Sequence, residues 1–198
     1  SHLNDIGFDV LYQTTVGDNY NRMKKVIENA LTRADIVITT GGLGPTQGDI
    51  TKYVCAEITG KKMVTHEESK KRMYDHFKEK DIPMTENNLR QVLVPDGADV
   101  FVNYNGIAPG IVQNYDGKFL INLPGPPREM KNMFDKSLKP FLKDKFGIEH
   151  VIYSVVLDTF DIGESFLETE IRDLILKQHN PTLALLVRPS GVIIRITA

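Results

Sequence analysis

The sequence is poor in the features that mark several large classes of protein. It has one cysteine, Cys55, among 198 residues, so it makes no internal disulfide, and a reducing cytoplasm is the expected location. Cys55 is expected to pack as a small hydrophobic residue rather than to react. No apolar run approaches the roughly 20 residues that a membrane-spanning helix needs. We therefore expect neither a membrane partner nor a signal peptide.

An excess of charge of one sign is also lacking. The 24 Lys and Arg residues nearly balance the 26 Asp and Glu residues, for a formal net charge of -2, so nothing attracts the chain in bulk to nucleic acid. None of the five histidines lies near another at metal-ligand spacing, which argues against a zinc site. The length suffices for one sizeable domain and a small second one.

The feature around which the rest is organised is a stretch at residues 34–51, which is typical of a strand, a glycine-rich loop and the start of a helix. Ile36, Val37 and Ile38 form the continuous apolar run of a buried parallel strand. The glycines that follow, Gly41, Gly42 and Gly44, permit positive φ and close approach of a ligand to the backbone. Free N–H groups in the first turn of the next helix would face that loop, and such a corner binds anions, phosphate above all.

The loop differs from two well-known phosphate motifs. A P-loop has Gly-Lys-Ser/Thr before its helix, whereas this chain has Gly48, Asp49 and Ile50, with an acid in place of the lysine. The glycine spacing also differs by one residue from the dinucleotide-binding fingerprint. An acid beside a phosphate is consistent with a divalent metal ion between the two. The alternative is that Asp49 is only the N-cap of the helix.

A second corner is predicted further along the chain. A buried strand at residues 118–123, the second arm of a hairpin, runs into Gly and Pro residues and then a helix from about residue 128. Two such corners on one parallel sheet predict a crevice at the carboxyl ends of the strands. Asp18 follows another predicted strand, at residues 9–15, so Asp18 and Asp49 are candidates for holding a metal and a phosphate together. The alternative for Asp18 is a simple turn with Gly17.

The remaining pattern predicts two domains. Helices are expected at residues 21–33, 49–59 and 65–80, the last opening with a capping box from Thr65. After Gly147 a strand at 151–157, a helix at 163–178 and strands at 182–187 and 192–197 predict a small α+β (β-α-β-β) domain. We place the domains at residues 1–147 and 148–198. Both ends look cut, so we expect the first strand of the larger domain and the C-terminus of the smaller one to be missing.

Several of these stretches resemble one family. Residues 40–51, Thr-Gly-Gly-Leu-Gly-Pro-Thr-Gln-Gly-Asp-Ile-Thr, are similar to the signature of the competence/damage-inducible CinA-type proteins, which belong to the molybdopterin-binding, molybdenum-cofactor-biosynthesis fold. Residues 16–19, 85–91, 105–110, 123–129, 161–165 and 180–182 agree as well, in the same order along nearly the whole chain. The resemblance implies a three-layer α/β/α domain with a mostly parallel sheet, a small α/β domain after it, and a homodimer.

The resemblance also implies site residues. Asp18 and Asp49 match the family's two site acids, with catalytic and metal-binding roles for Mg²⁺ or Mn²⁺. The family's ligand loop and far pocket wall match Gly41, Gly42, Gly44, Thr46, Thr51, Asn105, Pro124, Gly125 and Pro126. One departure stands out: the signature usually has two acids where this chain has Gly48 and Asp49.

Three functions are compatible with these observations. The family resemblance favours metal-dependent hydrolysis of a nucleotide-sugar diphosphate, with ADP-ribose giving AMP and ribose 5-phosphate, and we expect an ADP-ribose pyrophosphatase-type enzyme. The second is a molybdopterin-binding protein of molybdenum-cofactor biosynthesis. The third is a non-catalytic nucleotide-binding module. In each case the partner is a phosphorylated small molecule, a nucleotide-sugar or a pterin. The family's C-terminal nicotinamide-nucleotide amidase domain is not present in this sequence, so no deamidase activity is assigned to it.

Overall fold

The computed structural model describes residues 2–148 and 153–198. They fall into two compact units, each built around its own sheet. The larger unit comprises Thr14–Leu142, and the smaller one takes the remainder of the chain from both ends. The domain boundary predicted at Gly147 stays a prediction.

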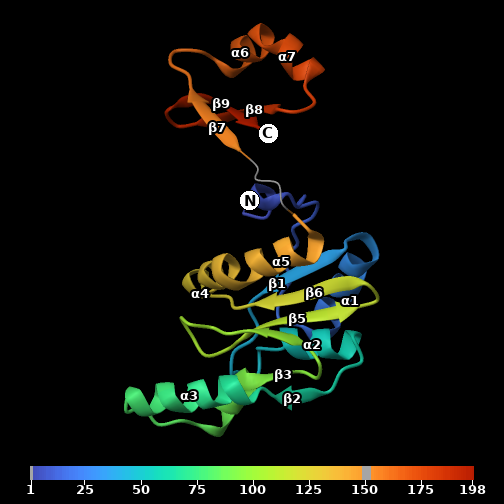
Figure 1. Cartoon of the computed structure of the whole chain (residues 1–198), viewed down its shortest axis with the longest axis vertical. Coiled ribbons are helices and arrows are strands. Elements are labelled where there is room, and N and C mark those ends of the chain that lie inside the picture. The colour runs from blue at the N-terminus through green and yellow to red at the C-terminus, as the bar shows by residue number, and fades with distance from the viewer. Residues whose placement is uncertain (1, 149–152) are drawn as a thin grey trace. The chain divides into compact units, whose positions relative to one another are not determined.

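A four-stranded mixed sheet forms the centre of the larger unit. Its order is β1 (Ile36–Thr40), β6 (Lys118–Leu123), β5 (Gly110–Tyr115) and β4 (Asp99–Phe101). The pairing of β1 with β6 is parallel, and the other two pairings are antiparallel. The predicted hairpin of residues 111–123 is confirmed as β5 and β6. Because Thr40 pairs with Leu123, β1 and β6 end side by side at one edge of the sheet (Figure 1).

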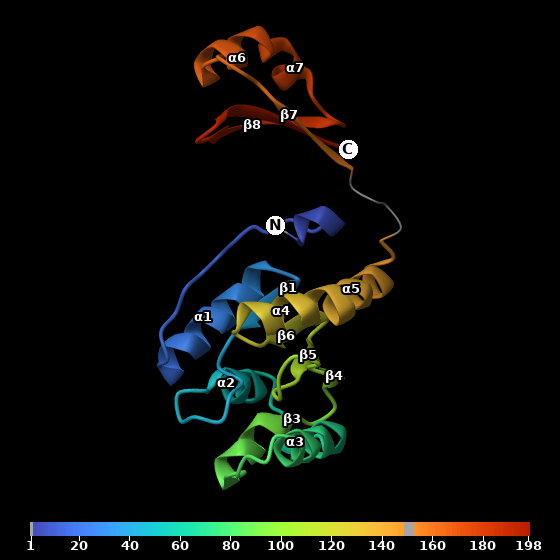
Figure 2. The ribbon, with the colours of Figure 1, turned by 90° about the vertical axis from the view of Figure 1, so that its left-hand side faces the viewer.

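Helices cover both faces of this sheet (Figure 2). On one face, α1 (Tyr20–Arg33) and α2 (Thr51–Ile58) pack against Leu120 in the hydrophobic core. The opposite face is covered by the run of α4 (Pro127–Met133), a π-helical turn (Phe134–Leu138) and α5 (Lys139–Phe146). Phe141 of α5 makes an edge-to-face contact with Phe119, which points away from its neighbour Leu120. The predicted three-layer α/β/α class is confirmed, but the sheet of the described residues is mixed rather than mostly parallel, because the hairpin of β5 and β6 and the pairing of β4 with β5 are antiparallel.

A short two-stranded sheet lies beside the main one. It pairs β2 (Met63–Thr65) with β3 (Leu93–Pro95), and the chain between them forms α3 (Glu67–Glu79) and the 3-10 helix η2 (Glu86–Val92). The predicted capping box at Thr65 is wrong, because Thr65 is the last residue of β2. The N-cap is His66, whose Nδ1 accepts a hydrogen bond from the N–H of Ser69 at 3.3 Å.

Two further expectations are corrected. No strand forms at residues 9–15, where Val10, Leu11 and Tyr12 are exposed rather than buried against a sheet. A strand needs a neighbouring strand to pair with its backbone, and among the described residues no strand pairs with this segment. The helix predicted to start near Asp49 begins at Thr51. Among the helices of the described residues, none is long and apolar enough to cross a bilayer.

The smaller unit has the β-α-β-β pattern that the sequence predicts. Its elements are β7 (Ser154–Asp158), α6 (Glu164–Glu170), α7 (Arg172–Lys177), β8 (Thr182–Arg188) and β9 (Gly191–Thr197), with the three strands antiparallel in the order β7-β9-β8. The single helix expected at residues 163–178 is broken in two at Ile171. Residues 151 and 152 of the expected first strand lie outside the described residues. At the other end of the chain, a short 3-10 helix (Asn4–Ile6) is closed by Gly7 in the left-handed conformation.

The burial of Cys55 gives a prediction about thiol reactivity. Its side chain is fully buried and its Sγ accepts a hydrogen bond from Asn122 Nδ2 at 3.1 Å. Burial raises the pKa of Cys55 to about 12, although the bond from Asn122 opposes this shift. We expect no reaction with a thiol reagent in the native protein at about pH 8, and one thiol per chain after unfolding in guanidinium. Gly60→Cys, in an open turn, is the reactive control. Fast native labelling of Cys55 would contradict the packing described.

Candidate functional site

Three loops meet the same edge of the main sheet. The glycine loop at residues 41–50 follows β1, and the Pro-Gly-Pro segment at residues 124–126 follows β6. Because β5 runs antiparallel to β6, the loop at residues 102–109 that precedes β5 also lies at this edge. These three loops therefore lie where the sequence predicts a crevice, at the carboxyl ends of β1 and β6, and the crevice itself stays a prediction.

The two glycine-bearing corners touch each other through their backbones. The N–H of Gly41 donates to the carbonyl oxygen of Leu123 at 2.9 Å, one residue beyond the paired strands. A Cβ atom on Gly125 would lie only 3.2 Å from the Cα of Gly41, and Gly41 itself has a φ of 92°. The absence of side chains at both positions lets the corners approach this closely.

The other glycines of the loop make room for the loop's own side chains. Gly42 has a φ of +70°, and a Cβ atom there would lie 2.0 Å from Thr51 Oγ1. A Cβ atom on Gly44 would lie 2.7 Å from Asp49 Oδ2. Thr51 and Asp49, both predicted from the resemblance as site residues, thus shape the loop from within.

Asp49 organises the loop rather than capping the helix. Its Oδ2 accepts hydrogen bonds from the N–H of Thr46 at 2.8 Å and from Thr46 Oγ1 at 2.6 Å, while the N-cap position of α2 is Ile50. Burial acts to raise the pKa of Asp49, but the bonds from Thr46 and from the N–H of Gly44 outweigh it, with help from the charge of Lys52. The pKa is therefore held below the ordinary 3.8, and the carboxylate stays ionised.

The remaining predicted residues are placed around this loop with differing involvement. Asp18 lies at its far end, since a Cβ atom on Gly48 would come 3.9 Å from Asp18 Oδ2. Pro124 is buried beneath the second corner, whereas Pro126 is exposed. Asn105 is exposed as well, and its N–H donates to Asn103 Oδ1 at 3.0 Å. The structure brings the two acids to one loop, and their proposed roles toward a ligand stay predictions.

The far wall depends on Asn103, a residue that the sequence did not single out. Asn103 is buried, and its Nδ2 donates to the carbonyl of Ala108 at 2.9 Å and to Glu129 Oε2 at 2.7 Å. These bonds close the loop on itself and fix it to the first turn of α4. The sequence marked this loop as polar, but nothing in it separates the buried Asn103 from the exposed Asn105.

A second unpredicted residue is Lys52, in the first turn of α2. Its side chain is fully buried, and its Nζ donates to the carbonyl of Leu43 at 3.5 Å and to the carbonyl of Arg90. Burial and the charge of Arg90 lower the pKa of Lys52 to about 7, against the opposing pull of Asp49. A lysine next to a helix start is expected to be exposed, so no sequence signal indicated its burial.

The described residues do not form a self-sufficient metal centre. Across residues 2–148 and 153–198, no three or more His, Cys, Asp or Glu side chains gather where they could hold a metal ion. One oxygen of Asp49 is already engaged by Thr46. The residues fit a cation only if a ligand phosphate supplies further oxygens, as is common for Mg²⁺. The predicted metal requirement therefore stays a prediction.

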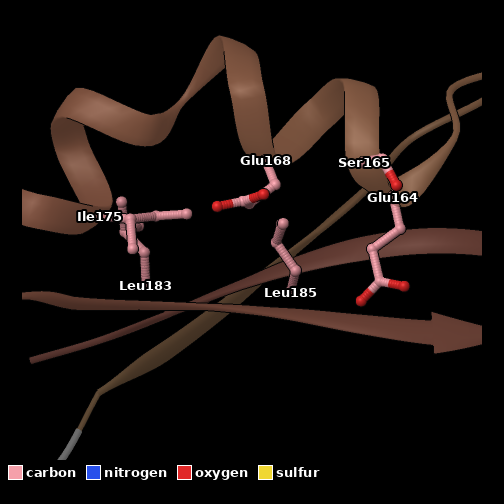
Figure 3. Close-up of a pocket in the computed structure, with 6 residues that line it drawn as sticks. All are labelled: Glu164, Ser165, Glu168, Ile175, Leu183 and Leu185. Atoms are coloured by element: carbon pink, nitrogen blue, oxygen red, sulfur yellow. The ribbon is translucent and has the colours of Figure 1, made fainter.

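The smaller unit has a separate hollow of about 370 Å³ between its helices and β8 (Figure 3). It is lined by Ile175, Leu183 and Leu185 together with Glu164, Ser165 and Glu168. Two carboxylates beside an apolar floor repel phosphate. This hollow therefore does not share the anion-binding chemistry of the glycine corner, and we assign the candidate site to the larger unit.

Comparison with known families agrees with the resemblance. The family described as "Probable molybdopterin binding domain" matches residues 1–144, and the family described as "Damage-inducible protein CinA KH domain" matches residues 154–198. The chain belongs to the CinA-type molybdopterin-binding family. This membership, predicted from the loop signature, is confirmed.

Individual relatives give the same result. CinA-like proteins of Dictyoglomus turgidum and Dictyoglomus thermophilum are 47% and 46% identical over 196 residues, which is 99% of this chain and 47% of each relative. The chain thus spans about half the length of these relatives. A crystal structure described as the protein CinA with unknown function, from Thermoplasma acidophilum, is 28% identical with a TM-score of 0.62, over 70% of this chain and 81% of the other.

These findings correct the expected activity. The prediction of an ADP-ribose pyrophosphatase that releases AMP and ribose 5-phosphate is wrong: the matched family is described by molybdopterin binding, and the relatives are CinA-like proteins rather than pyrophosphatases. The error came from transferring an activity along with a fold, although one fold hosts many functions. The second hypothesis, a molybdopterin-binding protein, is better supported.

The glycine loop gives a matched pair of substitutions. Gly42 and Gly60 have φ values of +70° and +66°. A Cβ atom at Gly42 would overlap Thr51, whereas a Cβ atom at Gly60 would have no other atom within 4 Å. We expect Gly60→Ala to lower the free energy of unfolding by about 1–2 kcal/mol, the cost of the left-handed backbone. Gly42→Ala should cost clearly more. Chemical denaturation followed by circular dichroism measures both, and equal losses would show that the loop is looser than described.

Lys52 gives a prediction about pH. An unfolded lysine keeps its proton up to its ordinary pKa of 10.5, whereas the folded one loses it above about 7. Between these values the unfolded state binds more protons, so the free energy of unfolding contributed by Lys52 rises with pH. In urea unfolding, wild type should gain stability between about pH 7 and 10 relative to Lys52→Met. The exposed Lys61→Met is the control and should follow wild type. Parallel profiles for wild type and Lys52→Met would refute the shift.

Proposed function

We propose that the larger unit binds a phosphorylated, pterin-type small molecule at the glycine corner. The observation that carries this proposal is the loop itself, which Asp49 and Thr46 hold in a fixed shape over the start of α2 at the open edge of the sheet. Family membership supports the pterin class, because the matched family is described as a molybdopterin binding domain.

The phosphate is the part of the ligand that this corner suits. First-turn N–H groups of α2, those of Thr51 and Lys52, have no helical acceptor, and the N-terminal end of the helix dipole favours an anion. The ionised Asp49 opposes a bare phosphate at close range. A Mg²⁺ or Mn²⁺ ion bound jointly by the phosphate and a carboxylate would offset that repulsion. Metal dependence is therefore part of the proposal and of its test.

The finer expectations stay predictions. These are a cytoplasmic location, a homodimer and the lack of a nucleic-acid partner. Because the CinA-like relatives are about twice as long as this chain, the activity and partners of a full-length protein are outside the present proposal.

Binding can be tested by isothermal titration with 6-hydroxymethylpterin monophosphate and with the unphosphorylated pterin, each with Mg²⁺ or EDTA. We expect the phosphorylated compound to bind at least about tenfold more tightly, as charge-assisted hydrogen bonds require. Thr46→Val removes the hydroxyl donor from Asp49 and keeps the N–H donor, so binding should weaken about 5- to 10-fold, the equivalent of one hydrogen bond.

Thr32→Val is the matched control, since Thr32 Oγ1 donates only to Asn29 within α1. Its affinity should equal that of wild type. If the wild-type protein binds neither pterin, or binds the unphosphorylated one more tightly, the proposal is refuted. A Kd that EDTA does not change would refute the metal dependence and leave the proposed pterin site intact.

A further inference from the structure

Arg90 lies in the last turn of η2, and Lys52 links its carbonyl group to the glycine loop. The position of its backbone is set from two directions. Thr85 and Asn88 form a capping box at the start of η2, with Asn88 Oδ1 accepting from the N–H of Thr85 at 2.8 Å. At the other end, the carbonyl of Arg90 accepts a hydrogen bond from Lys52 Nζ. The same ammonium group contacts the carbonyl of Leu43 in the loop, so one buried lysine joins the loop to η2.

The side chain of Arg90 is held but not neutralised. Its Cζ lies 5.3 Å from the centre of the Tyr53 ring, a cation–π contact on the first turn of α2. Its Nε is buried and has no hydrogen-bond partner within the described part of the chain. Among the described residues, no carboxylate forms an ion pair with Arg90. An unpaired buried donor on a cation is costly unless a ligand or water satisfies it.

We propose that Arg90 supplies a guanidinium contact to the anionic group of the ligand at the glycine corner, and that Lys52 is the positioning residue that holds Arg90 and the loop together. The inference deepens the proposed function and rests on it. A guanidinium matches phosphate oxygens with two parallel N–H donors, which gives geometric selectivity as well as charge.

Lys52 fits the positioning role because it cannot reach the ligand itself. Its ammonium is fully buried and points at two carbonyl groups, in the loop and in η2. Removing it leaves both carbonyls without that donor and frees η2 from the loop. The effect on binding should then pass through Arg90.

The test compares Arg90→Gln, Arg90→Lys, Lys52→Met and the double variant Lys52→Met/Arg90→Gln by titration with the pterin monophosphate and the unphosphorylated pterin. Arg90→Gln should lower the affinity for the pterin monophosphate about tenfold or more and should change the affinity for the unphosphorylated pterin little. Arg90→Lys keeps the charge but loses the two parallel N–H donors, so its affinity for the pterin monophosphate should be intermediate. The exposed Arg172→Gln, in α7 of the smaller unit, is the matched control and should bind as wild type does.

The positioning role of Lys52 is read from non-additivity. If Lys52 acts through Arg90, Lys52→Met and the double variant should weaken the phosphorylated ligand equally, whereas independent residues would add. Equal losses for both pterins would instead mean that Lys52→Met only destabilises the loop, and would overturn the role. Lys52→Gln, which keeps a donor, replaces Lys52→Met if the latter does not fold.

The two proposals fail in different ways. Wild-type and Arg90→Gln proteins with the same affinity for the phosphorylated pterin would refute the role of Arg90 and leave the proposed function intact. If wild type binds neither pterin, inorganic pyrophosphate is titrated and the Nε–H signal of Arg90 is followed by nuclear magnetic resonance. A shift of that signal would support the anion contact of Arg90 and refute the pterin as its ligand. An unchanged signal would refute both the anion contact and the pterin.

Discussion

The parallel pairing of β1 with β6 is the constraint on which the candidate site depends. It pairs Thr40 with Leu123, so the two strands end side by side. The next residues are then close enough for Gly41 to donate to Leu123 and to lie against Gly125. Neither corner could be built this way around a side chain. The glycines are thus needed first for folding, and the position of the candidate site follows from that packing.

The loop is organised by its own polar groups before any ligand arrives. Asp49 accepts hydrogen bonds from Thr46, and Thr51 fills the space that Gly42 leaves. Fixing the loop in advance reduces the conformational entropy lost on binding, which is a main cost of recognition. It also places an ionised carboxylate where an anion is expected to bind, so cationic groups close by are required. Lys52 is buried and does not reach the ligand, so Arg90 is the cation that we propose for this contact.

The sequence predicted features set by local pattern and missed those set by tertiary contacts. The glycine corner, the hairpin of β5 and β6 and the β-α-β-β unit each have a signal within a few neighbouring residues, and each is confirmed. The strand expected at residues 9–15 has strand composition but pairs with no strand of the described residues, and composition alone does not reveal this. The burial of Lys52 and of Asn103 depends on segments 38 residues and 26 residues away, so local pattern could not predict either one. Activity was a further step, since a shared loop signature specifies a fold but not a reaction.

Unsatisfied polar atoms gather around the same helix that bears the site. Within the described residues, the buried Arg90 Nε, Gln113 Nε2 and Asn122 Oδ1 have no hydrogen-bond partner. Arg90 lies against Tyr53 of α2, Gln113 accepts from Thr59 just after its end, and Asn122 contacts Cys55 within it. A core selected for stability alone would have apolar residues there, because each unpaired buried group is unfavourable. These polar groups surround the helix whose N-terminus forms part of the candidate site, and departures from optimal packing are expected where function requires them.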